Sequence, residues 1–428
     1  MPDKLDPVAS HYNRFPFPTV KSFTVPQPCR FKGDSLNFLL SRREKNWLAG
    51  DIDIWIAGCG TQQALHWAMC FPKARIIATD ISKTALKIAE SFAQQLNVDN
   101  IKFELLDIGQ QCFKNDFDLI ICTGVLHHIS SPESGLVNVR TALKRNGAAL
   151  IMLYNRMHRE PLKIFRDAHK LLSQDNENES SRYDLAITML EELSQSDKLQ
   201  PPLNFEPSLS STLDNLLEVY NKDKSLVADA LLQPREISFD IDELFKLIES
   251  SGFKHSAWLE PRLWELSTYT TNKELLSRFK KLDNISKYKA IYNLAGYASP
   301  MFSFLVEHVD LPKSKPYSES ELIDMPVLFN SSTQTVCFDS GSFIKSESAN
   351  TYKIKENKII GNVNKTGNTQ SFWQLPACAE ELLVACDGKT TIRELYYKFD
   401  TKFSKEEIYE TLYKLLPDKL GLITLSLS

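Results

Sequence analysis

Residues 54–80 of this 428-residue chain read IWIAGCGTQQALHWAMCFPKARIIATD. An apolar strand leads into a turn at Gly58-Cys59-Gly60, and an amphipathic helix and a second apolar strand that ends on Asp80 follow. Because glycine has no Cβ, a ligand can approach this turn closely, and the helix N-terminus behind it offers unpaired N–H groups. A carboxylate about twenty residues further on, at a strand end, suits the two hydroxyls of a ribose. The stretch therefore predicts a nucleoside-binding half-fold.

The neighbouring sequence bears on which nucleoside is bound. The dinucleotide fingerprint G-x-G-x-x-G has a third glycine, and this chain has Gln63 in that place. Two further strands are expected, in IKFELLD (101–107) and in FDLIICTGVLHHI (117–129). The order of glycine turn, Asp80, Asp107 and FDLIICTGVLHHI resembles the class I S-adenosylmethionine-dependent methyltransferases. Within that family it is similar to enzymes that methylate small molecules or side chains.

The resemblance covers residues 51–154 and implies S-adenosylmethionine as the cofactor. It implies that the glycine turn lies under the methionine part of the cofactor, that Asp80 holds the ribose and that Asp107 reaches the adenine amino group. The cofactor-binding residues expected from it are Gly58, Cys59, Gly60, Asp80, Ile81, Asp107, Ile108 and Thr123. Two positions depart from the family pattern. Ile56 replaces a customary acidic residue, and Gln62 replaces a customary third glycine.

Simpler interpretations stand beside these. Glycine turns after strands also serve packing alone, and Asp80 and Asp107 could be ordinary caps at strand ends. His127 and His128 could bind a metal, but the sequence has no second ligand pair at helical spacing, so a structural or substrate-facing role is preferred. No metal site is predicted, and no catalytic base is identified.

Composition limits the classes of function. At this length two or three domains are expected, and a hydrophobic content of 43% supplies ample core material. The net charge of −4 makes nucleic acid an improbable partner. The eight cysteines include no C-x-x-C pair, which favours reduced thiols, and no apolar run is long enough to span a membrane. A cytoplasmic protein is predicted.

Residues 1–50 are interpreted as an N-terminal arm. The segment HYNRFPFP (11–18) is expected not to form a regular helix because proline restricts itself and its predecessor. The family resemblance implies that such an arm closes over the cofactor, so Tyr12, Arg14 and Phe15 are candidates for lid or substrate contacts. The alternative is that these aromatic residues only fasten the arm to the core. An amphipathic helix is expected over residues 35–49.

The segment from residue 51 to residue 260 alternates strands and helices, which predicts a Rossmann-like, mostly parallel sheet with helices on both faces. Lys144-Arg-Asn-Gly147 is expected to be the turn before the fifth strand. Because ligands bind at the carboxyl edge of such sheets, Tyr154, Asn155, Arg156 and His158 join His127 and His128 as substrate-site candidates.

Further divisions follow from the rest of the chain. A helical cap is expected over residues 161–234, with polar spacers at 173–182 and 200–207, and then a helix capped by Asp240 and ended by Gly252. A strand at 253–259 and a helical connector at 261–308 should come next. The last domain, 309–428, should hold strands within 327–338 and 352–362 and then a winged helix, with an Asp387-Gly388 turn and Thr390 as a helix cap.

That final pattern resembles the small peptide-recognition domains of peptide-modifying enzymes, and its acidic residues disfavour phosphate binding. A plain packing or dimerisation module is the alternative. Taken together, the sequence predicts a methyltransferase that acts on a small-molecule or peptide/protein nucleophile. The rival hypotheses are a non-catalytic binding protein with a degenerate fold that acts through its C-terminal module, and a nicotinamide oxidoreductase. The oligomeric state is not predicted.

Overall fold

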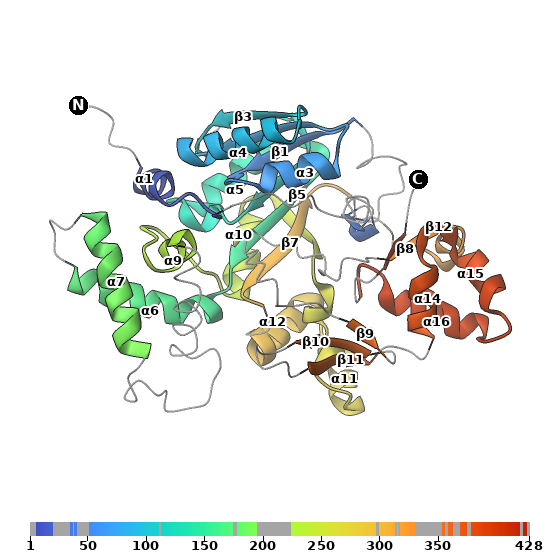
Figure 1. The fold of residues 1–428 in the computed structure, drawn as a ribbon. Coiled ribbons are helices and arrows are strands. Elements are labelled where there is room, and N and C mark those ends of the chain that lie inside the picture. The colour runs from blue at the N-terminus through green and yellow to red at the C-terminus, as the bar shows by residue number, and fades with distance from the viewer. Residues whose placement is uncertain are drawn as a thin grey trace.

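A seven-stranded sheet forms the centre of the computed structural model, and the elements that carry the candidate site surround it (Figure 1). Its strands are β1 (Asp53–Ala57), β2 (Arg75–Asp80), β3 (Ile101–Leu105), β4 (Phe117–Thr123), β5 (Leu143–Tyr154), β6 (Phe253–Trp258) and β7 (Met301–His308). The structure describes residues 6–19, 35–36, 38–40, 51–110, 113–173, 178–194, 224–296, 299–312, 315, 317–329, 353–355, 358–362, 369–374, 378–419 and 423–425.

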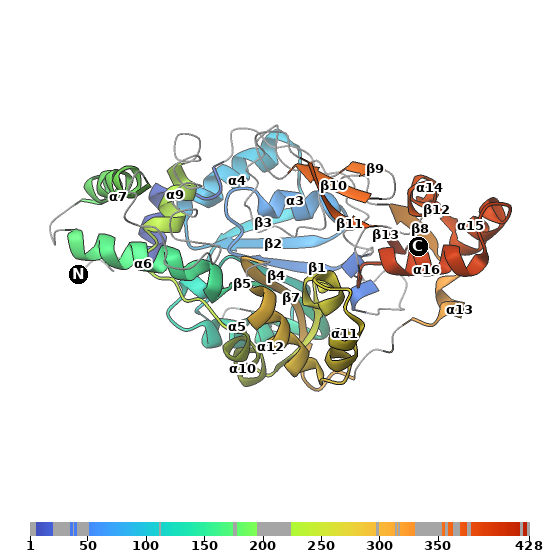
Figure 2. The ribbon, with the colours of Figure 1, turned by 90° about the horizontal axis from the view of Figure 1, so that it is seen from below.

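The strand order is β3-β2-β1-β4-β5-β7-β6. Strands β1 to β5 pair in parallel, whereas β7 runs antiparallel to both β5 and β6. Helices cover both faces, as Figure 2 shows, with α3 (Gln63–Cys70) and α4 (Lys83–Gln95) on one face and α5 (Pro132–Ala142), α10 (Ile241–Ser250) and α12 (Asn284–Ala295) on the other. The predicted mostly parallel, Rossmann-like sheet is confirmed.

Strand β1 shows how the sequence produces two buried faces. Successive side chains of a strand point to opposite sides, and both sides of this sheet are covered by helices. Trp55 and Ala57 accordingly belong to the hydrophobic core on one face, and Ile54 and Ile56 to the core on the other. An apolar run without alternation is therefore the expected signature of this strand.

The region from residue 261 to residue 308 differs from the expected helical connector. It does contain helical turns at η3 (Pro261–Trp264) and η4 (Leu266–Thr268) and the helices α11 (Lys273–Lys280) and α12. Its last eight residues, however, form β7, which inserts between β5 and β6. A short apolar run such as MFSFLVEH does not reveal from its periodicity whether it is helix or strand. The sheet thus extends to His308, beyond the expected boundary at residue 260.

The expected turn at Lys144-Arg-Asn-Gly147 is also wrong, because these residues lie inside β5. A register shift between β4 and β5 falls at this point. A Cβ on Gly147 would lie 2.9 Å from the carbonyl oxygen of Asp118, so the glycine permits a close approach between the two strands. Gly147 therefore allows β4 and β5 to approach each other and does not form a turn.

The N-terminal arm contains a helix where none was expected. Helix α1 (Pro7–Arg14) includes the first half of the HYNRFPFP segment. The Asp6 side chain accepts a hydrogen bond from the Val8 amide at 2.7 Å, and Pro7 occupies the first helical turn, where proline is favourable. The prolines at 16 and 18 act only beyond the end of the helix. Most of the helix predicted over residues 35–49 lies outside the described residues.

The expected helical cap is formed by α6 (Arg156–Leu172), α7 (Glu179–Ser194) and α9 (Lys224–Leu231). These helices have a hydrophobic cluster of their own, to which Phe15 of the arm also packs. Helix α6 begins at Arg156, five residues before the expected start of the cap, and α7 begins inside the spacer expected at 173–182. The spacer expected at 200–207 lies outside the described residues.

The C-terminal region forms two small sheets and a helical cluster. Its elements are α13 (Glu319–Leu322), β8 (Pro326–Phe329), β9 (Lys353–Lys355), β10 (Lys358–Asn362), β11 (Thr369–Gln374), α14 (Ala379–Ala385), β12 (Asp387–Thr391), α15 (Ile392–Phe399), α16 (Lys405–Leu415) and β13 (Ile423–Leu425). The strand orders are β12-β8-β13 and β11-β10-β9. Asp387 and Gly388 begin a strand, and Thr391, in place of the expected Thr390, caps α15.

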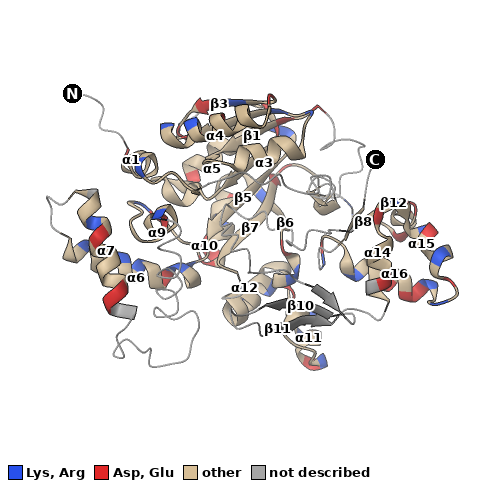
Figure 3. Ribbon diagram, viewed as in Figure 1, with Lys and Arg blue, Asp and Glu red and all other residues tan. Residues whose placement is uncertain are grey.

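Both signs of charge occur along the outer helices, including α15 and α16 (Figure 3). All five cysteines in the described ranges carry free thiols. Within those same ranges, no helix has both the length and the apolar character needed to cross a bilayer.

Candidate functional site

The turn between β1 and α3 has a backbone that glycine alone adopts easily. Gly58 and Gly60 have φ values of 71° and 54°, in the left-handed region. The amides of Gly58 and Cys59 both donate to the carbonyl oxygen of Thr79, at 2.8 and 2.9 Å. A Cβ on Gly60 would lie 2.7 Å from the carbonyl oxygen of Phe17, so the arm rests directly on the turn.

Asp80 closes β2 beside this turn. Its carboxylate accepts hydrogen bonds from the amides of Gly60 and Ser82, both at 2.8 Å. Burial raises the pKa of Asp80, and the backbone N–H groups of Ser82, Gly60 and Ile81 oppose the rise. Each carboxylate oxygen retains acceptor capacity, so the group can still receive the two hydroxyls of a ribose.

Asp107 and Ile108 follow β3, as expected from the sequence. The Asp107 carboxylate accepts from the Gly109 amide at 2.8 Å, and it is partly exposed. Ile108 is buried, and its carbonyl oxygen accepts from the Asn138 side chain at 2.9 Å. The loop is therefore held in place by α5, while the Asp107 side chain stays partly exposed after the end of the strand.

Gln63 and Thr123 meet where α3 begins and β4 ends. The Gln63 Nε2 atom donates to Thr123 Oγ1 at 2.5 Å, whereas the buried Gln63 Oε1 has no hydrogen-bond partner. Cys59 lies buried in the same turn, where burial and then the Asp80 charge raise the pKa of its thiol well above the usual value. An inert thiol and an open acceptor thus border the turn.

The N-terminal arm is hydrogen bonded to the residues around Asp80. Thr61 donates through its hydroxyl to the Pro18 carbonyl at 2.6 Å. Asn13 Oδ1 accepts from the Ser82 hydroxyl and from the Thr84 amide, both at 3.1 Å. Since Ser82 itself donates to Asp80, the arm, the glycine turn and the acid form one connected unit.

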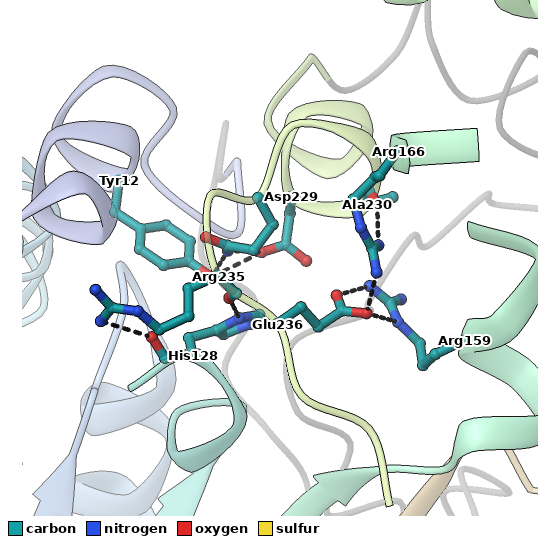
Figure 4. A network of polar contacts seen from close by, with 9 residues as sticks. Tyr12, His128, Arg159, Arg166, Asp229, Ala230, Arg235 and Glu236 are labelled. Carbon is teal, nitrogen blue, oxygen red and sulfur yellow. Dashed lines mark hydrogen bonds and ion pairs between the residues drawn. The ribbon is translucent and has the colours of Figure 1, made fainter. Parts of the chain in front are cut away.

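Tyr12 extends from the arm toward the helical cap (Figure 4). Its hydroxyl donates to Asp229 Oδ1 on α9 at 2.7 Å and accepts from Gln233 Nε2 at 2.7 Å. Burial and then the Asp229 carboxylate raise the pKa of Tyr12 well above its usual value, and Tyr154 and Asp80 add to the rise. The Tyr12 hydroxyl is thus close enough to both carboxylates to feel their charge.

The two adjacent histidines pack beside Tyr12. The His127 ring stacks on Tyr154, with centroids 3.7 Å apart, and His128 lies edge-on to Tyr12 at 6.2 Å. His128 Nδ1 is 2.8 Å from the carbonyl oxygen of Arg235, and this oxygen accepts a hydrogen bond from the Nδ1–H group. Burial lowers the pKa of both histidines, so both rings are neutral at pH 7. Neither nitrogen of His127 has a hydrogen-bond partner.

A buried ion-pair cluster closes the other side of Tyr154. Glu236 pairs with Arg159 and with Arg166, the latter at 2.6 Å, and the Glu236 side chain is only 3% exposed. The Arg159 guanidinium lies over the Tyr154 ring at 4.0 Å from its centroid. Both arginines contact the one Glu236 carboxylate, as Figure 4 shows, so the cluster carries one positive charge in excess.

Four of the candidate substrate residues have other contacts in the structure. The Asn155 side chain donates to the carbonyls of Gly296 and Ser299 and caps α6, and Arg156 pairs with Asp240 and Glu243 at the start of α10. Arg14 is exposed and lies against the Phe15 ring. His158 lies in the first turn of α6, where its amide donates to the carbonyl oxygen of Asn155 at 3.2 Å. Asn155 and Arg156 therefore stabilise the fold, and a contact of either residue with the substrate stays a prediction.

The structure adds residues that the sequence did not single out. They are Asn13, Gln63, Arg159, Arg166, Asp229, Gln233 and Glu236. Gln63, three residues after Gly60, drew attention in the sequence only as the residue in place of a fingerprint glycine, and its contact with Thr123 was not expected. Asp229 in α9 and Gln233, two residues beyond the end of that helix, are the polar residues of the otherwise apolar segment LVADALLQ (226–233), which is the signal that could have revealed them.

Residues 56–207 match the family model of a methyltransferase domain. The chain is 27% identical over 323 residues to an uncharacterised protein of Synechococcus. The matched stretch covers 73% of this chain and 74% of the relative. It is also 29% identical over 124 residues to the uncharacterised methyltransferase YcgJ of Bacillus subtilis, across 28% of this chain and 47% of that protein.

Solved structures show a similar fold over nearly the whole chain. PKMT2 from Rickettsia typhi superposes with a TM-score of 0.63 at 14% identity, over 94% of this chain and 76% of that one. The same protein in complex with AdoHcy gives a TM-score of 0.61, also at 14% identity, over 95% and 77%. At this identity the likeness concerns the fold alone. The chain thus matches a methyltransferase-domain model over residues 56–207 and shares its fold with a larger protein.

Proposed function

From the methyltransferase domain at residues 56–207, we propose that the chain transfers a methyl group from S-adenosylmethionine to a small-molecule or peptide/protein nucleophile. The observation that carries the proposal is the pairing of the Gly58–Gly60 turn with the Asp80 carboxylate at the ends of β1 and β2. The AdoHcy complex of PKMT2, a protein of similar fold, supports the choice of cofactor.

The residues present fit this cofactor. Asp80 would hold the ribose hydroxyls, and Asp107 with Ile108 would border the adenine ring. Gly58, Cys59, Gly60 and Thr123 would line the methionine part. Gln63 Oε1, a buried acceptor without a donor, would receive the cofactor's amino group and so replace the acidic side chain that Ile56 lacks.

The bound cofactor supplies an electrophilic methyl group on a sulfonium, so the protein's task is to orient a nucleophile and exclude water. The arm serves exclusion, because Phe17 and Pro18 cover the glycine turn and Asn13 fastens α1 to α4. Tyr12, His127, His128 and Tyr154 form an aromatic wall that would face the acceptor.

We further propose that the C-terminal region is a winged-helix module that recognises a peptide or protein. Its three helices α14, α15 and α16 pack on a separate hydrophobic cluster, with β8, β12 and β13 as its sheet. Acidic side chains such as Glu394, Glu406 and Glu407 lie on its outer helices, which disfavours a nucleic-acid partner.

Calorimetry tests the proposal on the full chain. S-adenosylmethionine and S-adenosylhomocysteine are each expected to bind the folded protein, and NADH is not. Binding of neither would leave the alternative of a binding protein with a degenerate site, and tight NADH binding would favour an oxidoreductase.

A further inference from the structure

The side chains of Tyr12, Gln233 and His128 have used all of their hydrogen-bond donors. The Tyr12 hydroxyl donates to Asp229, and Gln233 Nε2 reaches both Tyr12, at 2.7 Å, and Asp229 Oδ1, at 3.4 Å. His128 Nδ1 donates to the Arg235 carbonyl, because a carbonyl oxygen carries no proton. No donor in this set is left for a ligand.

Acceptors, in contrast, are left open. Gln233 Oε1 and His128 Nε2 are buried and have no hydrogen-bond partner. With Nδ1 protonated and the ring neutral, His128 Nε2 is an acceptor. Asp229 receives hydrogen bonds at Oδ1 only, from two neutral groups. Buried polar atoms are normally paired, so open acceptors from three neighbouring side chains point to a ligand with several donors.

The charges of the neighbouring side chains also favour a cationic ligand. Glu236 is compensated by Arg159 and Arg166, whereas Asp229, only 6% exposed, takes part in no ion pair within the described part of the chain. Arg159 and Arg166 together carry one positive charge more than Glu236, and Arg159 interacts electrostatically with Asp229 without a direct ion pair in the described part of the chain. A cationic ligand would add the direct contact that Asp229 lacks. The rings of Tyr12 and His128 beside it suit a cation as well.

We infer, on the basis of the proposed methyltransferase function, that the methyl acceptor is an amine, whose ammonium form is recognised by Asp229, Gln233 and His128. An ammonium group has three N–H donors and no acceptor, which matches three open acceptors. For the transfer, one of these protons passes to His128 Nε2, and the neutral amine stays hydrogen bonded to Asp229 and Gln233. Its lone pair then forms the bond to the methyl carbon as the carbon–sulfur bond of the cofactor breaks. An alcohol has a single donor, and a carboxylate substrate would be repelled by Asp229. Tyr12 is followed in α1 by Asn13, which accepts a hydrogen bond from the Ser82 hydroxyl, and the Ser82 amide donates to Asp80, so this amine site adjoins the cofactor side.

The test titrates n-butylammonium, n-butanol and butyrate into the full chain, with and without S-adenosylhomocysteine, and follows binding by ligand-observed NMR. The wild type is expected to bind the ammonium and neither of the others. Asp229→Asn should weaken ammonium binding about tenfold or more, and Gln233→Leu about fivefold. Both variants should bind S-adenosylhomocysteine as the wild type does, which also reports on their folding. Asp184→Asn, at an exposed carboxylate on α7, is the matched control and should change nothing.

The inference is overturned if the wild type binds no ammonium, if butanol or butyrate binds as well, or if Asp229→Asn and Gln233→Leu both retain full ammonium affinity. These results leave cofactor binding untouched. Failure of S-adenosylhomocysteine to bind would instead remove the proposed function, and ammonium binding to the free protein would then still decide whether Asp229 holds a cation.

Discussion

The amide of Gly60 donates a hydrogen bond to Oδ2 of Asp80 at 2.8 Å. The bond joins the turn after β1 to the end of β2, twenty residues further along the chain. Asp80 is held from the other side by the Ser82 amide, so its carboxylate has little freedom to rotate. A preorganised acceptor of this kind loses little entropy when a ligand binds.

Asp80→Ala should therefore weaken binding of S-adenosylhomocysteine by roughly 1.5–3 kcal/mol, the value of a charge-assisted hydrogen bond. Calorimetry measures the change. Glu90→Ala, at an exposed position on the following helix α4, is the control and should bind normally. Equal affinity of Asp80→Ala and wild type would remove Asp80 from the cofactor site.

The arm should act on the release of the cofactor. Deletion of residues up to Pro18 uncovers the glycine turn, and Asn13→Ala removes the acceptor shared by Ser82 and Thr84. Stopped-flow measurement should show faster dissociation of S-adenosylhomocysteine in both cases, with the larger effect for the deletion. Lys83→Ala, exposed at the start of α4, should dissociate at the wild-type rate. Unchanged release from the shortened protein would reduce the arm to packing.

Some of these features could be predicted from the sequence because they are local. The glycine turn, the strand that ends on Asp80 and the Asp240 cap each depend on residues close together in the chain. The contact between Tyr12 and Asp229 spans 217 residues, and no local pattern encodes it. Strand β7 was missed for a related reason, since only its pairing with β5 and β6 distinguishes it from a buried helix.

Asp240→Ala should destabilise the protein by about 1–2 kcal/mol. The Asp240 side chain accepts from the Glu243 amide at 2.9 Å in a capping box and also pairs with Arg156. Urea unfolding gives the free energy directly. Asp242→Ala, on the exposed side of the same helix and paired only with Lys289, is expected to cost less than 1 kcal/mol. Equal losses in the two variants would argue against the cap.

Glu236 should make stability depend on pH. Burial alone would raise the pKa of Glu236, but Arg159 and then Arg166 outweigh it, and the pKa lies below its usual value. The stabilisation is therefore fully present above the unfolded pKa of about 4.3 and is lost as the pH falls through the lower folded value. Glu236→Gln should cost about 3–5 kcal/mol at pH 7 and progressively less toward pH 3. Asp167→Asn, from the exposed pair with Lys163, should show almost no cost. A pH-independent loss would contradict this assignment.

A chain that ends at Pro312 should retain cofactor binding and lose activity on its natural acceptor. It keeps all seven strands of the main sheet, whereas an end at Asn362 would leave β8 without β12 and β13. Circular dichroism establishes that the shortened protein is folded. If the shortened protein is folded but binds no S-adenosylhomocysteine, the C-terminal region must reach the cofactor site. The proposal that this region serves recognition alone would then be wrong.

The helical cap leaves and rejoins the sheet at almost the same point. Asn155 and Phe239 form a β-bridge, and Arg156 pairs with Asp240 across 84 residues of sequence at 2.9 Å. Because these contacts hold the two ends of the cap segment together, its length and sequence can change with little effect on the strands that support it. During evolution the whole cap segment can therefore be replaced as one unit, together with the preference for a methyl acceptor that it carries, while the central sheet stays the same.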